Sequence, residues 1–323
     1  MVKNKWVAAA AMASALLTSP FTATAADTAS VAVSQIVEHP ALDATRQGLL
    51  DGLKDKGYVE GKNLNFTYQT AQGNPAIAVQ IARQFVGENP DVLVGIATPS
   101  AQALAAATKS IPVVFTAVTD PVGAKLLGDM DKPSGNVTGL SDLSPVAQHL
   151  DLAMELLPGM KSIGVVYNPG EANAVTLVEL LKNAASKKGI EVVEGTALKS
   201  ADVQAAAQIV ASKSDAIYAP TDNTVASAID GLVGAAKQAG VPVIGGSTSY
   251  APNGAVASLG FDYYQIGYQT ADYVSQLLKG KSASELPARV ATGSDLAVNL
   301  RMAKELGITV PQSILDRATG TVE

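Results

Sequence analysis

The chain has 323 residues, of which 47% are hydrophobic and 16% are charged, so it can bury a large core and has room for about two ordinary domains. Its net charge is −6, and because nucleic-acid binding leaves a basic footprint, a nucleic-acid partner is disfavoured. Only five arginines occur, and since Arg is the side chain best suited to hold phosphates and dicarboxylates, heavily anionic ligands are disfavoured too.

Residues 1–25 have the layout of a secretory signal peptide. Two early lysines precede an apolar run over residues 6–17, and the small residues 23–25 form a cleavage pattern, which predicts cleavage before Ala26. The run is too short for an ordinary membrane span, although an uncleaved anchor is the alternative. Because the chain has no cysteine, it has no disulfide and no thiol-linked lipid. We therefore expect a free, monomeric protein of the periplasm.

The rest of the chain alternates between short apolar strands and amphipathic helices. Gly57 and Pro75 mark a helix end and a helix start, and the continuous apolar run 91–96 is typical of a strand buried on both faces. The expected strands are 31–36, 63–68, 91–96, 112–115, 162–167, 191–195, 216–219 and 242–245. The expected helices are 42–56, 75–88, 98–108, 174–188, 200–213 and 224–239.

The same pattern occurs twice. Segments 30–34 (SVAVS), 91–95 (DVLVG) and 111–115 (IPVVF) recur in order as 162–166 (SIGVV), 215–219 (DAIYA) and 241–245 (VPVIG). We predict two α/β lobes, each an open parallel sheet with helices on both faces. The lobes are expected to span 26–142 with about 260–290, and 143–259 with about 291–323. The chain would cross between them within 140–146, 257–262 and 287–295, which forms a hinge.

In open parallel sheets, ligands bind beyond the carboxyl ends of the strands. The expected ligand contacts there are Ser34, Gln35, Thr98, Ser100, Thr116, Ala117, Thr119, Asp120, Asn168, Thr221, Asp222 and Asp262. A helix that starts near Ser100 could hold a carboxylate, and Asp120, Asp222 or Asp262 could hold an ammonium, so the set suits a zwitterion. Several of these residues could instead be ordinary helix caps or turn residues.

Signatures of enzymes and metal sites are weak. His39 and His149 have no spacing that suggests a metal site, and His39 is interpreted as a solvated loop residue. The fragment 280–282 (GKS) lacks the earlier glycine of a phosphate loop, and no nucleophile elbow occurs. We predict a binding protein that uses no cofactor and catalyses no reaction, although spatially paired carboxylates cannot be recognised from sequence.

Several motifs in order resemble the substrate-binding proteins of ABC transporters of the tryptophan/tyrosine uptake type. They are 34–43 (SQIVEHPALD), 96–99 (IATP), 114–121 (VFTAVTDP), 167–173 (YNPGEAN), 220–224 (PTDNT) and 262–267 (DYYQIG). The resemblance implies the type I periplasmic binding protein fold, with two Rossmann-like lobes, three crossings and a ligand held between them. It also implies an aromatic amino acid as ligand and delivery to a membrane permease driven by a separate ATPase.

The identity of the solute stays open at this point. Tyr167 or Tyr250 could stack on a flat side chain, whereas segment 246–250 (GSTSY) departs from the acidic or larger residue expected by analogy. A branched-chain amino acid, a nucleoside or a sugar is the alternative, and the lack of Trp after Trp6 disfavours a sugar. A gene regulator with the same architecture would need a DNA-binding helix pair.

Overall fold

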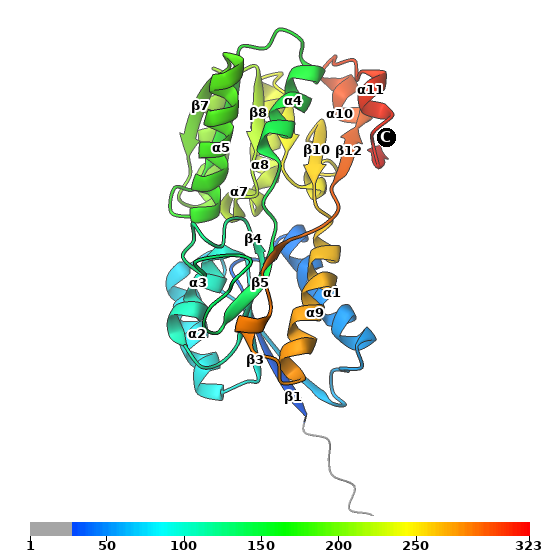
Figure 1. Ribbon diagram of the computed structural model, residues 1–323. Coiled ribbons are helices and arrows are strands. Elements are labelled where there is room, and N and C mark those ends of the chain that lie inside the picture. The colour runs from blue at the N-terminus through cyan, green and yellow to red at the C-terminus, as the bar shows by residue number, and fades with distance from the viewer. Residues whose placement is uncertain (1–27) are drawn as a thin grey trace, which may run out of the picture.

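The computed structural model describes residues 28–323, so the expected signal peptide lies outside the described residues. Two α/β lobes lie end to end, with the N-terminal lobe below and the C-terminal lobe above in Figure 1. No helix within the described residues is both long enough and apolar enough to cross a membrane. The predicted fold class, two lobes built on largely parallel sheets flanked by helices, is confirmed.

The N-terminal lobe is built on a six-stranded parallel sheet of order β11-β5-β4-β3-β1-β2. Its strands are β1 (Ala29–Gln35), β2 (Leu64–Thr70), β3 (Val92–Ile96), β4 (Val113–Val118), β5 (Val137–Ser141) and β11 (Arg289–Val290). Its helices are α1 (Pro40–Asp55), α2 (Pro75–Glu88), α3 (Thr98–Ala107) and α9 (Tyr263–Leu278), with the short 3-10 helix η3 (Ala283–Glu285). Right-handed crossovers place α2 with α3 on one face and α1 with α9 on the other (Figure 1).

The C-terminal lobe contains a seven-stranded sheet of order β13-β12-β10-β9-β8-β6-β7. Its strands are β6 (Ser162–Tyr167), β7 (Glu191–Thr196), β8 (Ala216–Ala219), β9 (Val243–Gly245), β10 (Ala257–Gly260), β12 (Asp295–Asn299) and β13 (Gly320–Val322). Its helices are α4 (Val146–Leu156), α5 (Ala172–Lys188), α6 (Val203–Ala211), α7 (Asn223–Ala226), α8 (Ile229–Gln238), α10 (Leu300–Glu305) and α11 (Gln312–Leu315), with the 3-10 helices η1 (Ser200–Asp202) and η2 (Thr248–Tyr250).

One strand pair departs from the expected parallel sheet, because β10 and β12 are antiparallel. Strand β10 runs toward the other lobe and the chain leaves the sheet at its end, whereas β12 begins where the chain returns. A strand that enters a sheet beside the one that has just left it must run in the opposite direction. The expectation of a purely parallel second sheet was therefore wrong at this edge.

The chain passes between the lobes at three places. These are residues 142–145 between β5 and α4, residues 261–262 between β10 and α9, and residues 291–294 between β11 and β12 (Figure 1). We keep 142, 260 and 290 as the proposed lobe boundaries. Each lobe has its own hydrophobic core, so the lobes can change their relative position without disturbing either core.

Helices α1 and α9 pack with their backbones in direct contact. A Cβ atom added at Gly48 of α1 would overlap the carbonyl group of Tyr264, and one added at Gly267 of α9 would overlap the carbonyl of Thr45. Both helices begin at the end of the lobe that faces the other lobe. The glycine contact therefore fixes the two helix N-termini relative to each other.

We expect Gly48→Ala to lower the free energy of unfolding by about 1–3 kcal/mol, because the atoms it would overlap are backbone atoms that cannot turn away. Urea unfolding followed by circular dichroism measures the change. Gly234→Ala in α8 is the matched control, since nothing lies within 4 Å of its added Cβ, and it should stabilise the helix by about 0.5–1 kcal/mol. Equal stability of Gly48→Ala and wild type would contradict the close packing.

Candidate functional site

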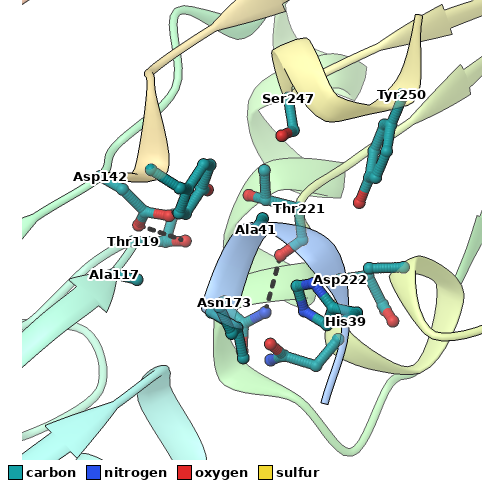
Figure 2. Close-up of a pocket in the computed structure, with 14 residues that line it drawn as sticks. His39, Ala41, Ala117, Thr119, Asp142, Asn173, Thr221, Asp222, Ser247 and Tyr250 are labelled. Atoms are coloured by element: carbon teal, nitrogen blue, oxygen red, sulfur yellow. Dashed lines mark hydrogen bonds between the residues drawn. The ribbon is translucent and has the colours of Figure 1, made fainter. Parts of the chain in front are cut away.

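A small cavity lies between the lobes, where the chain ends several strands and begins several helices (Figure 2). Its lining residues come from both lobes and from the first crossing. They are His39, Ala41, Leu42, Ala117, Thr119, Asp142, Asn173, Thr221, Asp222, Asn223, Ala226, Ser247, Tyr250 and Tyr263. The cavity volume is about 20 Å³, which is room for about one water molecule. A larger solute therefore requires the walls to move apart.

The N-terminus of α1 forms one wall. His39 occupies the N-cap position without a side-chain capping bond, and Pro40, the first helical residue, has no N–H group. The backbone N–H groups of Ala41 and Leu42 have no partner within the helix, since the first turn of a helix leaves its donors free. Because these residues line the cavity, the positive end of the helix dipole faces it and can hold a negative group.

The end of β4 forms the adjoining wall through an irregularity in the strand. The pairing of β4 with β5 shifts register between Thr116 and Val118, and Ala117 takes a left-handed conformation with φ of 52°. Such a backbone is strained for a residue other than glycine. The irregular backbone places both Ala117 and Thr119 at the cavity, although they are two positions apart.

Asp142 lies at the first crossing and is almost fully buried. Its Oδ2 accepts a hydrogen bond of 2.6 Å from the Tyr263 hydroxyl, and its Oδ1 accepts one of 3.3 Å from the Thr119 hydroxyl. Burial, which disfavours the charged form, raises the pKa of this carboxyl group, and the two hydroxyl donors partly oppose that effect. The lining residues include no Lys or Arg that could balance the charge.

A second buried carboxyl group, Asp222, lies on the C-terminal lobe. It is the N-cap of α7, and its two oxygens accept backbone N–H bonds from Val225 at 2.8 Å and from Asn168 at 2.6 Å. Burial raises its pKa well above the usual range, and the neighbouring Glu171 raises it further. Two carboxyl groups therefore meet the cavity without a cationic side chain, which is an expensive arrangement unless a ligand supplies positive charge or donors.

Glu171 holds the polar side chains of this wall in place. Its Oε2 accepts from the backbone N–H of Asn223 at 3.1 Å, from the Asn223 side chain at 2.6 Å and from Asn173 Nδ2 at 3.2 Å. Its Oε1 accepts from the backbone N–H and the hydroxyl of Thr224. Asn173 Nδ2 also donates to the Thr221 carbonyl, so its Oδ1 is left facing away from both bonds (Figure 2).

Three buried polar atoms of the lining find no hydrogen-bond partner within residues 28–323. They are His39 Nε2, Asn173 Oδ1 and Thr221 Oγ1. Burial lowers the pKa of His39 to about 4. The Asn223 side chain and the negative charge of Asp43 both raise this pKa but are outweighed, so the imidazole is neutral at pH 7. Leaving a buried polar group unpaired costs about 1–3 kcal/mol, and three such atoms around one cavity point to a polar ligand.

The remaining lining is apolar or aromatic. Two small side chains, Ala117 and Ala226, form part of it, and the larger Leu42, Tyr250 and Tyr263 form the rest. The Tyr250 hydroxyl donates to the carbonyl of Pro220, so its polar end is already satisfied. These surfaces suit a flat, largely apolar side chain.

A larger groove of about 600 Å³ lies beside the cavity and shares Asn223 with it. Residues from both lobes line it, among them Val37, Pro99 and Leu198. Its carboxylate, Glu171, already accepts the hydrogen bonds described above. The three unpartnered atoms described above belong to the cavity and not to the groove. We therefore interpret the cavity as the ligand site and the groove as a route toward it.

Four of the residues expected at the site from sequence line the cavity, namely Ala117, Thr119, Thr221 and Asp222. Asn168 lines the groove and bonds to Asp222. The other expected residues do not line the cavity. Four of them make hydrogen bonds elsewhere: Ser34 with Ser100, Gln35 with Val37 and Asp43, Thr116 with Thr270, and Asp120 with Gly123. Thr98 is buried away from the cavity, and Asp262 caps α9 at the surface.

Most of the lining was not identified from sequence. His39 is buried at 9% exposure, so its interpretation as a solvated loop residue was wrong. Pro40 could have indicated the position of His39, because proline is favoured in the first turn of a helix. Helix α1 begins at Pro40, two residues earlier than expected, so His39 is its N-cap. Asp142 carried no comparable signal. Asn173 and Tyr263 lie within recognised motifs, and Ser247 in segment 246–250, but none was singled out, whereas Tyr250 had been considered for stacking.

We expect His39 to make stability depend on pH. Its pKa is about 4 when folded and 6.5 when unfolded, so the unfolded state binds the proton more tightly and stability falls as pH drops from about 6.5 toward 4. The loss between pH 7 and pH 5 is about 2 kcal/mol for one such histidine. His149 has the same lowered pKa and adds a similar loss.

Urea unfolding at pH 7 and pH 5 measures this dependence. His39→Gln should reduce the loss by about half, and the same change at His149 gives the matched comparison. If His39→Gln loses as much stability as wild type on acidification, the histidine is not held neutral by burial.

Together, a two-lobed fold, a hinge of three crossings and a polar cavity between the lobes define a binding protein that encloses a small molecule. The sequence profile of the family described as ABC transporter substrate binding protein matches residues 30–322. The chain therefore belongs to the ABC transporter substrate-binding proteins, and the family recognised from its motifs is confirmed.

Two relatives are similar to this chain over most of its length. A tyrosine-binding protein of Clostridioides difficile (strain R20291) is 37% identical over 276 residues, which cover 85% of this chain and 80% of that protein. A conserved domain protein from Vibrio cholerae is 71% identical, with a TM-score of 0.91 over 91% of this chain and all of the other.

Two further solved structures bear on the arrangement of the lobes. An ABC domain in complex with L-Trp from Streptococcus pneumonia is 36% identical, with a TM-score of 0.89 over 92% of this chain and 100% of that one. A ligand-free, open substrate-binding protein with adhesive properties from Clostridium difficile is also 36% identical, but its TM-score is 0.68 over 91% of this chain and 100% of that one. At equal identity, the lobes here are arranged more like those of the L-Trp complex.

Proposed function

We propose that this protein captures an aromatic amino acid between its two lobes and delivers it to the permease of an ABC importer. The observation that carries the proposal is the composition of the cavity. A free helix N-terminus faces two buried carboxyl groups and three unpartnered polar atoms, and aromatic rings form the remaining walls. Each part of an aromatic zwitterion has a complementary group in this lining.

The backbone of the amino acid fits the end of the cavity near α1. Its carboxylate would accept from the N–H groups of Ala41 and Leu42, where the helix dipole favours negative charge. Its ammonium would donate to Asp222 and to the free Oδ1 of Asn173. The two ligand groups share one carbon atom, so the residues that hold them must lie along the same part of the lining.

Once the walls have moved apart enough to admit a ring, the side chain of the solute would lie against Tyr250 and Tyr263, beside the small Ala117 and Ala226. The tyrosine-binding relative and the L-Trp complex support this choice over a branched-chain amino acid, a nucleoside or a sugar. Of the residues expected from sequence, we keep Ala117, Thr119, Thr221 and Asp222 as proposed ligand contacts.

Closure of the lobes provides the mechanism. The ligand contacts both walls only when the lobes are together, so its binding free energy favours the closed arrangement over the open one. The narrow cavity shows that side chains of both lobes already meet in this arrangement, so solute can pass in and out only when they separate. The permease would then recognise the closed, loaded shape.

The remaining parts of the role follow from the same proposal. The protein would act as a monomer that binds its solute without changing it chemically, uses no cofactor and binds no nucleic acid. Residues 1–25 would direct it to the periplasm without a lipid anchor, since the sequence has no cysteine. Its partner would be an inner-membrane permease with a separate ATPase subunit, as for the family to which the chain belongs.

A thermal-shift panel tests the choice of solute. We expect Trp, Tyr or Phe, at about a hundredfold excess over the dissociation constant, to add about 2.7 kcal/mol to the free energy of unfolding. Leucine, ribose and adenosine at the same concentrations serve as comparisons. A clear shift with one of these and none with any aromatic amino acid would overturn the aromatic assignment.

Substitution of Asp222 tests the ammonium site. Asp222→Asn keeps an oxygen that can accept from Val225 and preserve the helix cap, but it removes the negative charge and the acceptor for the Asn168 N–H. We expect the affinity for Trp and Tyr to fall by about 10- to 100-fold in isothermal calorimetry, which is the range of a lost charged hydrogen bond.

Asp262→Asn is the matched control, because Asp262 is also a helix N-cap but is exposed and lies outside the cavity. Its affinity should equal that of wild type. The opposite pattern, with Asp262→Asn weakened and Asp222→Asn unchanged, would move the ammonium to Asp262 and contradict the proposed orientation.

A further inference from the structure

We propose that Asp142 makes the site selective for aromatic rings that carry a hydrogen-bond donor, the indole N–H of Trp or the phenol O–H of Tyr, over the phenyl ring of Phe. This inference rests on the proposed function and adds to it how the ring of the solute is recognised. It names Asp142 as a ligand-binding residue that determines specificity.

The first step is the separation of the two carboxyl groups. In Figure 2, Asp142 and Thr119 lie on one side of the cavity, Asp222 and His39 lie on the other, and Ala41 lies between them. The ammonium and carboxylate of an amino acid are joined to one carbon, so both must occupy one side. The α1 N-terminus and the unpartnered Asn173 favour the side of Asp222.

The side chain of the solute then points toward Asp142. The hydroxyls of Tyr263 and Thr119 occupy one acceptor position on each oxygen of Asp142, and each oxygen has a further lone pair. Asp142 is 2% exposed, so solvent does not fill the others. Because Asp142 also lines the cavity, a donor on the solute can reach the remaining positions.

The two hydroxyl donors also hold the carboxyl group in place. Tyr263 begins α9 directly after the second crossing, and Thr119 follows the end of β4, so Asp142 is tied to two elements of the N-terminal lobe. The Ser141 hydroxyl further bonds to the Thr119 carbonyl at 2.9 Å. A fixed acceptor discriminates well, because it cannot turn away when the ligand has no donor.

The cost of a mismatch gives the direction of selectivity. A ring without a donor would cover the buried carboxyl group and provide no hydrogen bond in return, which is an unfavourable burial. A site built around a polar group of its ligand rejects the analogue that lacks this group more strongly than an apolar pocket rejects a missing methylene. We expect Trp and Tyr to bind at least about tenfold more tightly than Phe.

Calorimetry on the wild-type protein provides the first test. The ligands are Trp, Tyr, Phe and 3-(3-benzothienyl)alanine, which keeps the shape of Trp but replaces the indole N–H by sulfur. We expect Phe and the sulfur analogue to bind at least about tenfold more weakly than Tyr and Trp, respectively. Equal affinity within each pair would overturn the inference while leaving the capture of aromatic amino acids intact, whereas no binding of any of the four would overturn the proposed function itself.

Asp142→Asn provides the second test and identifies the residue. The neutral amide is a weaker acceptor and costs less to cover, so Trp and Tyr should lose affinity while Phe stays within about threefold or gains. An equal loss for all three ligands would show that Asp142 holds the ammonium or only supports the fold, and would overturn the assignment. Asp120→Asn, a neighbouring carboxylate that bonds to Gly123 outside the cavity, is the control and should leave all affinities unchanged.

Discussion

Two carboxyl groups buried at the junction of the lobes, with no Lys or Arg among the residues that line the same cavity, set the main physical constraint on this protein. Removing a charge from water is costly unless another group compensates for it. In Asp142 and Asp222 the compensation comes only in part from hydroxyl and backbone donors. The part of the burial cost that these donors do not offset can be offset by a ligand that brings an ammonium group or a hydrogen-bond donor. A site of this kind gains selectivity and a driving force for closure from the same pair of residues.

The fold could be predicted from sequence to a large extent, because its strands are short apolar runs with clear turn residues between them. The strand expected at 162–167 is β6 without change, and the run 91–96 is β3 with one residue fewer. Strand β5 was missed, since its sequence VTGLS contains a glycine and follows the turn-like residues 133–135 (PSG). Helices α7 and α8 were expected as one helix, because no glycine or proline marks the break at residues 227–228.

The site was harder to predict because the end of a strand indicates an edge of the sheet and says little about the direction of a side chain. Ser34 lies near the end of β1 and Ser100 in the first turn of the helix that follows β3, yet their hydroxyls face each other in the interior. The cavity instead depends on features of tertiary structure, such as the first turn of α1, the irregular end of β4 and the crossing at Asp142. Asp222, the N-cap of α7, was predicted correctly as a cavity residue, because helix N-caps and ligand sites both use short polar residues that follow strands.

The backbone contact between α1 and α9 has a consequence for how the protein could change its affinity during evolution. The two helices carry Ala41 and Tyr263 near their N-termini, and both residues line the cavity. The close backbone contact at Gly48 and Gly267 leaves no room for one helix to slide along the other. A small rotation of this pair would alter the spacing between the groups that hold the backbone and the ring of the solute. Substitutions on the outer surface of either helix could therefore retune ligand preference while every residue in contact with the solute stays the same.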